Sequence, residues 1–114
     1  MISMQKEIIS VVLSFIKPEL TGEAVGIYQE VIDNYKELKG CLGIQLFAKI
    51  NHSNEFMIVS KWRSLEERNE YLKSEFHKNA IERLKPCRQS DPIMNNFELY
   101  TEMDDKQLCN QPVL

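Results

Sequence analysis

The sequence offers few side chains of the types that perform catalysis. Its two histidines, His52 and His77, have no partner at the spacing of a catalytic triad or a metal site. The sequence also lacks a glycine-rich phosphate loop, a nucleophile elbow, an HExxH motif and a paired-carboxylate motif. His52 belongs to a cluster of turn-forming residues and is expected in solvent. His77 lies in a helical pattern, where it either faces solvent or lines a cavity.

Aromatic residues form a second group that could do chemistry, by binding a flat ligand. Trp62, Tyr71 and Phe76 offer ring faces, and the first two carry a polar tip, as is common in pockets for planar molecules. The same three rings would serve equally well in a hydrophobic core. An enclosed cavity with Tyr71 or His77 pointing into it would indicate an enzyme. A space filled by Tyr28, Tyr35, Trp62 and Phe76 would indicate a non-catalytic protein.

The cysteines, Cys41, Cys87 and Cys109, predict reduced thiols rather than disulfides or a metal site. Their number is odd, they form no CxxC pair, and no histidine stands at ligand spacing from them. We therefore expect a cytoplasmic protein that binds no metal.

Length and composition indicate one globular domain. The chain has 114 residues, of which 43% are hydrophobic and 27% charged, and its formal net charge is −3. This charge does not suit a nucleic-acid partner. The apolar runs are far shorter than the ~20 residues that cross a bilayer, and no secretion signal is recognisable, so no membrane contact is expected. We predict a single domain over residues 1–103 and a flexible, polar tail over 104–114.

Hydrophobic periodicity predicts the elements that must position the candidate side chains. Alternating or continuous apolar segments indicate strands over residues 8–16, 42–50, 56–62 and 95–103. Apolar residues repeating every three or four positions indicate one helix between Thr21 and Gly40. A second helix is expected from Ser64 to Pro86, with an interruption near Ser74.

Particular residue types mark the ends of these helices. Thr21 is expected to cap the first helix, and Gly40 to adopt the left-handed conformation after its last turn. Ser64 and Glu67 match a capping box at the start of the second helix. The charged cluster Glu66–Arg68 in the same turn is most simply a solvated helix face.

The order strand, helix, strand, strand, helix, strand predicts an α+β fold. With right-handed crossovers it favours the ferredoxin-like arrangement, in which a four-stranded antiparallel sheet carries both helices on one face. In that arrangement the first and third strands lie in the middle. The pattern agrees, because residues 8–16 and 56–62 are apolar on both sides, whereas 42–50 and 95–103 alternate as edge strands do.

The apolar second face of this sheet predicts a homodimer. The helices cover one face only, so Val12, Ile16, Phe56 and Ile58, or else the opposite set of side chains, would be exposed to water. Each such side chain would forfeit roughly 1.5–3 kcal/mol of burial energy. An identical chain packed face to face about a twofold axis would cover them and close the two sheets into a barrel.

Three segments of the sequence carry recognisable motifs, namely Lys39–Leu46, Phe56–Glu67 and Tyr71–His77. They resemble the "pG…G" motif, the strand ending in "W-x-S-x-E" and the helix motif "H-x-x-S-x-H-F" of the antibiotic biosynthesis monooxygenase (ABM) superfamily. The resemblance covers most of residues 8–103 and implies a dimeric α+β barrel. It also implies a monooxygenase that oxidises a small quinol, phenol or other aromatic substrate with O₂ in a dry pocket, without metal, flavin or haem.

The same resemblance assigns roles to individual residues. Trp62 matches the tryptophan that ends the family's strand, and Tyr71 stands where the family's helix often has its first histidine. Phe76 and His77 stand in the inverse order of the family's His-Phe pair, which turns the imidazole by about 100° around the helix. The resemblance thus implies Tyr71 and His77 as catalytic residues, and Trp62, Phe76 and Tyr28 as substrate-binding residues.

Two other functions stay open. The same fold would suit a non-catalytic or regulatory dimer that binds a small aromatic molecule or another metabolite. In addition, Ser90–Asn96 resembles the "S-P-I-x-N-N" segment of haem-degrading relatives. Those relatives use an asparagine, a tryptophan and an axial histidine where this sequence has Val12, Tyr71 and Ala80. Haem iron would therefore lack its proximal ligand, unless His77 takes that place.

Overall fold

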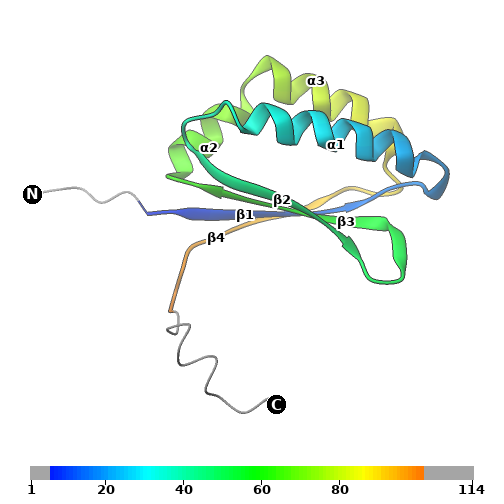
Figure 1. Cartoon of the computed structure of the whole chain (residues 1–114), viewed down its shortest axis with the longest axis horizontal. Helices are drawn as coiled ribbons and strands as arrows, with labels where there is room; N and C mark the ends of the chain where they lie inside the picture. The colour runs from blue at the N-terminus through cyan, green and yellow to red at the C-terminus, as the bar shows by residue number, and fades with distance from the viewer. Residues whose placement is uncertain (1–5, 102–114) are drawn as a thin grey trace, which may run out of the picture.

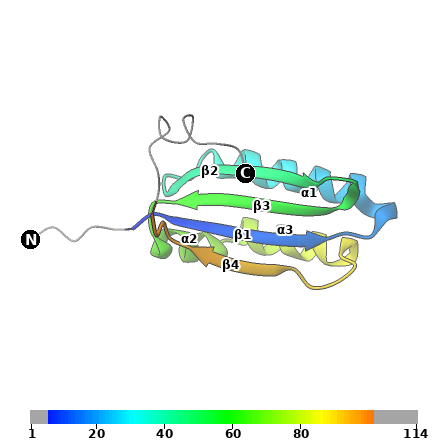
Figure 2. The same ribbon diagram turned by 90° about the horizontal axis from the view of Figure 1, so that it is seen from below.

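Residues 6–101, which the computed structural model describes, form a sheet with helices on one side (Figure 1). Four antiparallel strands lie in the order β2-β3-β1-β4 (Figure 2). They are β1 (Ile8–Phe15), β2 (Cys41–Lys49), β3 (His52–Trp62) and β4 (Ile93–Phe97). The predicted ferredoxin-like arrangement, with the first and third strands in the middle, is confirmed. The predicted tail over 104–114 lies outside the described residues.

Three α-helices cover the same face of the sheet (Figure 1). They are α1 (Thr21–Tyr35), α2 (Leu65–Leu72) and α3 (Glu75–Leu84), with short 3₁₀ turns η1 (Pro18–Leu20) and η2 (Lys85–Cys87) beside them. The interruption predicted near Ser74 separates α2 from α3. Ser74 caps α3 by accepting a hydrogen bond from the His77 backbone N–H at 3.1 Å, which fixes His77 in the first turn of α3. No helix in the described part of the chain is long and apolar enough to cross a membrane.

The last strand starts earlier and ends sooner than the predicted span of 95–103. β4 runs along β1, where Ile93 pairs with Leu13 and Phe97 pairs with Ile9. Because β1 begins at Ile8, a longer β4 would have almost no strand left to pair with. The residues that follow are accordingly highly exposed, and Tyr100 is 98% exposed.

The two predicted helix caps have different outcomes. Ser64 accepts a hydrogen bond from the Glu67 backbone N–H at 3.2 Å, so the cap of α2 is confirmed, although the Glu67 carboxylate binds Arg63 instead of turning back to the backbone. The prediction that Thr21 caps α1 is wrong. The 3₁₀ turn η1 leads directly into α1, and the Thr21 hydroxyl donates to the carbonyl of Pro18 at 3.0 Å instead of capping the helix.

Gly40 also has a different role from the one predicted. It is not in the left-handed region, because none of the described glycines has a positive φ. Instead, the first turn of α2 passes directly over it. A Cβ atom at position 40 would lie 2.5–2.8 Å from side-chain atoms of Glu67, so the close approach of α2 requires a glycine here.

The main core lies between the helices and one face of the sheet. Ile16 and Phe56 are 0% and 6% exposed, and both pack against helix residues. The first of the two predicted orientations, with Ile16 and Phe56 toward water, is therefore wrong, and the opposite set faces away from the helices. Sequence alternation did not distinguish the two faces because the helix-facing side of the sheet also carries buried serines, namely Ser10, Ser14 and Ser60.

Candidate functional site

A second buried cluster joins the end of β3 to α2. Trp62, the last residue of β3, is 2% exposed, and its indole N–H donates to the Ser60 hydroxyl at 2.9 Å. The Trp62 ring lies 5.7 Å from that of Tyr71, centroid to centroid. Tyr35, near the end of α1, meets both rings edge-on, at 5.3 Å from Trp62 and 4.7 Å from Tyr71. Three aromatic rings from three elements are thus in mutual contact under the helices.

Tyr71 brings a polar group into this apolar cluster. The residue is 5% exposed, and its buried hydroxyl makes no hydrogen bond of normal geometry with any described residue. Burial raises the pKa of Tyr71 to about 12. The phenol therefore keeps its proton at neutral pH and has a hydrogen bond to donate.

His77 completes the group that the sequence singled out. Its half-buried ring meets Tyr71 edge-on at a centroid distance of 5.1 Å. Burial, and then the positive charges of Arg68 and Arg88, lower the pKa of His77 below its usual value of 6.5. The imidazole is accordingly neutral at pH 7 and can accept a proton.

Two arginines lie near this histidine, and sequence reasoning missed both. Arg68 is 7% exposed, so its predicted place on a solvated face is wrong. The helical spacing could have indicated its burial, because Arg68 stands three residues before Tyr71 and therefore lies on the same side of α2. Arg88 follows η2, and its backbone forms an isolated bridge with Ile16 beside β1.

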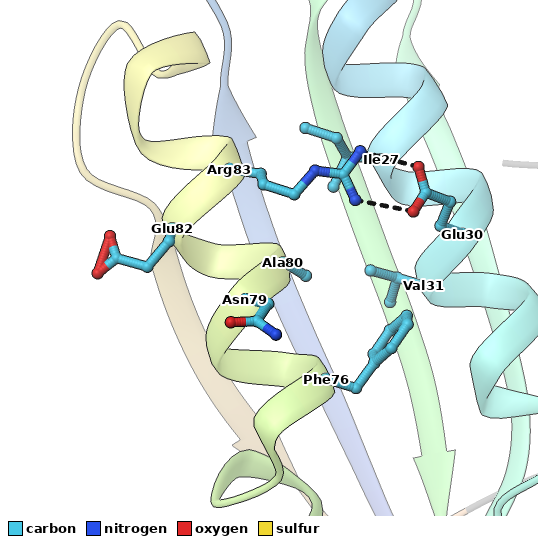
Figure 3. A pocket seen from close by; sticks show the side chains of 8 residues that line it. All are labelled: Ile27, Glu30, Val31, Phe76, Asn79, Ala80, Glu82 and Arg83. Atoms are coloured by element: carbon cyan, nitrogen blue, oxygen red, sulfur yellow. Dashed lines mark hydrogen bonds and ion pairs between the residues drawn. The ribbon is translucent and has the colours of Figure 1, made fainter.

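The structure does not bring the other two candidates into this group. Tyr28 belongs to the main core, where its hydroxyl hydrogen-bonds to Ser14 at 2.5 Å and its ring packs on Phe56. Phe76 points into a groove of about 510 Å³ between α1 and α3 (Figure 3). One wall of that groove is the ion pair of Arg83 with Glu30, at 2.7 and 2.9 Å.

A pocket of about 350 Å³ opens beside the aromatic cluster, with Trp62 and Tyr71 in its wall. The other lining residues come from the α1–β2 connection, from α2 and from the cap of α3, namely Leu38, Lys39, Gly40, Glu67, Glu70 and Ser74. His77 does not line this pocket and joins the group through its contact with Tyr71. We take Trp62, Tyr71 and His77 as the candidate site, with aromatic surface, one phenol donor and one imidazole. Within residues 6–101, no group of three or more His, Cys, Asp or Glu side chains is placed to hold a metal ion.

Sequence comparison identifies one family. A model described as "Antibiotic biosynthesis monooxygenase" matches residues 8–83, which include β1 to β3 and nearly all of α3. No curated protein matches the sequence significantly.

Solved structures resemble the fold over most of the chain. A crystal structure of an antibiotic biosynthesis monooxygenase has a TM-score of 0.78 at 16% identity, covering 82% of this chain and 99% of that one. Rv0793 from Mycobacterium tuberculosis has a TM-score of 0.78 at 12% identity, with 86% and 99% covered. SnoaB, a cofactor-independent oxygenase from Streptomyces nogalater, has a TM-score of 0.78 at 10% identity, with 88% and 99% covered. At these identities the likeness concerns the fold.

Proposed function

The chain belongs to the antibiotic biosynthesis monooxygenase family, and from this membership we propose that it is a monooxygenase. Its substrate is a small quinol, phenol or other aromatic molecule, its oxidant is O₂, and it uses no bound cofactor. The observation that carries the proposal is the neutral, half-buried imidazole of His77 against Tyr71. SnoaB, which has a similar fold, is a cofactor-independent oxygenase, and this supports the choice of oxidant and the lack of a cofactor.

The proposed reaction needs only an electron-rich ring and a base. Loss of the phenolic proton gives an anion with electron density on a ring carbon. That carbon transfers electrons to O₂ and forms a carbon–oxygen bond, and a proton converts the product to a hydroperoxide. Loss of water, with the hydrogen of the same carbon, leaves a carbonyl. Phenol and O₂ thus give a quinone and H₂O, with one oxygen atom in each product.

Each residue of the candidate site has a proposed part in this reaction. His77 accepts the proton of the substrate, because its lowered pKa keeps it unprotonated at neutral pH. The Tyr71 hydroxyl donates a hydrogen bond to the anionic oxygen, since it retains its own proton and makes no hydrogen bond of normal geometry with the described residues. Trp62 forms an apolar wall that keeps water from the anion. Phe76 and Tyr28 were expected to bind substrate, and we assign that part to Trp62 alone.

One observation favours a second candidate function. Tyr35 touches both Trp62 and Tyr71, so the three rings fill part of the space that a substrate would need. A protein of this fold that binds a small molecule in the neighbouring pocket without oxidising it would show the same packing. Oxygen consumption separates the two functions.

The test is the rate of O₂ uptake with 1,4-naphthoquinol or anthrone, measured with an oxygen electrode against the rate without protein. We expect His77→Gln to lower kcat by roughly 10²–10⁴-fold, as is usual on removing a general base. His52→Gln is the matched control, because His52 is exposed in the β2–β3 turn region, and it should keep the full rate. A wild-type rate no higher than the uncatalysed one would reject the monooxygenase in favour of the binding protein.

A further inference from the structure

Arg68 is a buried charge without an anionic partner in the described structure. Arg68 is only 7% exposed, and it takes part in none of the ion pairs formed within residues 6–101. Moving a charge out of water is unfavourable unless an opposite charge and hydrogen bonds compensate it. An arginine remains protonated in this environment, even though burial lowers the pKa of Arg68. The protein alone therefore leaves this guanidinium incompletely compensated.

The two neighbours that the guanidinium does have are neutral. Its Nη1 donates to the side-chain oxygen of Asn69 at 3.2 Å, and its Nη2 lies against the sulfur of Met94 on β4 at 2.6 Å. A guanidinium has five N–H donors, so most of its capacity remains available. Met94 is 47% exposed on an edge strand, and movement of its side chain would open the guanidinium to a ligand.

Arg88 carries a second guanidinium that is incompletely hydrogen-bonded. The Nε of Arg88 is buried without a hydrogen-bond acceptor in the described structure. Both arginines are close enough to His77 for their charges to lower its pKa, so their fields overlap at that ring. No carboxylate among the described residues forms an ion pair with Arg68. This side of the site is thus positive inside a chain whose net charge is −3.

We infer that Arg68 binds the carboxylate of a flat aromatic ligand. The inference rests on the proposed function, since it names the class of substrate for the same site. A carboxylate presents two oxygens that match the parallel N–H groups of one guanidinium, and such pairs are among the strongest in proteins. His77, whose half-buried ring feels the charges of both arginines, offers a ring surface for the aromatic part. The ligand would supply the negative charge that the fold lacks.

The test compares 1-naphthoate with the neutral 1-naphthamide by calorimetric titration of the full chain. Neither probe is a phenol or quinol, so binding is measured apart from oxidation. We expect naphthoate to bind at least roughly tenfold more tightly than naphthamide, because only the carboxylate pairs with a guanidinium. Arg68→Met, which keeps the aliphatic stem, should abolish this difference, and Arg68→Lys should restore part of it by keeping the charge. Arg83→Met is the control, because Arg83 is exposed and paired with Glu30.

Thermal melting of the same variants shows whether they fold and tests the role of Arg68 independently. If the charge is there for a ligand, Arg68→Met should melt no lower than the wild type without ligand. Naphthoate should raise the melting temperature of the wild type and of Arg83→Met, but not that of Arg68→Met. Equal affinity for the two probes, absence of naphthoate binding, or a lower melting temperature of ligand-free Arg68→Met would overturn the inference. None of these binding results changes the rate of O₂ uptake by the wild type with a neutral quinol, so failure of the inference would leave the proposed monooxygenase standing.

Discussion

At the scale of single residues, His77 links the candidate site to the pH dependence of stability. Burial and the charges of Arg68 and Arg88 hold its pKa below 6.5, the value expected in the unfolded chain. The unfolded state therefore binds the proton more readily, so stability rises with pH in this range. The stabilisation is complete above pH 6.5 and is lost as the pH falls through the folded-state pKa. We expect His77→Gln to reduce the loss of melting temperature between about pH 6.5 and pH 5.

Melting curves at several pH values check this prediction, with His52→Gln as the control. His52 is exposed, so its replacement should leave the wild-type profile unchanged. If the His77→Gln profile runs parallel to that of the wild type, then His77 is not held in its neutral form by the fold. In that case it would also be less suited to accept a proton from a substrate near neutral pH.

Single residues also show how far sequence reasoning reaches. Trp62, Tyr71 and His77 could be selected because few other side chains combine aromatic surface with a titratable or polar tip, and the fold does bring them together. Phe76 could not be placed, because its neighbours depend on how α3 meets α1 and not on its own helix. Arg68 was misread because its charge suggested solvent, whereas its helical spacing from Tyr71 indicated the interior.

At the scale of elements, the approach of α2 to the start of β2 depends on one glycine. A Cβ at position 40 would overlap Glu67, whose backbone N–H is held by the Ser64 cap. We expect Gly40→Ala to destabilise the protein by about 1–3 kcal/mol, because either α2 or the chain at position 40 must move. Gly26 offers a matched comparison in the exposed interior of α1, where nothing lies within 4 Å of an added Cβ. Gly26→Ala should instead stabilise by roughly 0.5–1 kcal/mol.

Urea unfolding monitored by circular dichroism gives both free energies of unfolding. Opposite signs for the two substitutions would support the contact between Gly40 and Glu67. If Gly40→Ala were as harmless as Gly26→Ala, then α2 would not be held against the α1–β2 connection as described. The pocket beside Trp62 and Tyr71 would then also lack its fixed wall, since Gly40 and Glu67 both line it.

Elements were predicted best where local chemistry alone determines them. The separation of α2 from α3 follows from Ser74, whose hydroxyl accepts the His77 N–H, and the cap of α2 follows from Ser64 in the same way. The end of β4 could not be read from its own alternation, because it depends on where β1 begins. Likewise, the sequence suggested that Gly40 ends a helix. The structure requires a glycine there because Glu67, which is distant in the sequence, packs against it.

At the scale of the whole molecule, one face of the sheet is not covered by the helices (Figures 1 and 2). By the strand register, this face carries apolar residues from all four strands, namely Ile9, Val11, Leu13, Phe15, Phe47, Met57, Val59, Ile93 and Phe97. Gln45, Glu55, Lys61 and Asn95 are the polar residues among them. Phe47, Ile93 and Phe97 are 42%, 49% and 53% exposed. A contiguous apolar surface of this kind marks an interaction site in a water-soluble protein. We propose that a second copy of the chain covers it, face to face, about a twofold axis.

Val11 gives the sharpest test of this homodimer. It lies in the middle of β1 and pairs with Val59 on one side and Asn95 on the other, so it is near the centre of the uncovered face. In a twofold dimer, Val11→Glu would place two carboxylates in an apolar interface, where unpaired charges are strongly unfavourable. We expect sedimentation velocity at micromolar concentration to give a dimer for the wild type and a monomer for Val11→Glu. Gln29→Glu adds the same charge on the exposed side of α1 and should remain dimeric. A monomeric wild type would contradict the dimer, and the apolar face would then require a different partner.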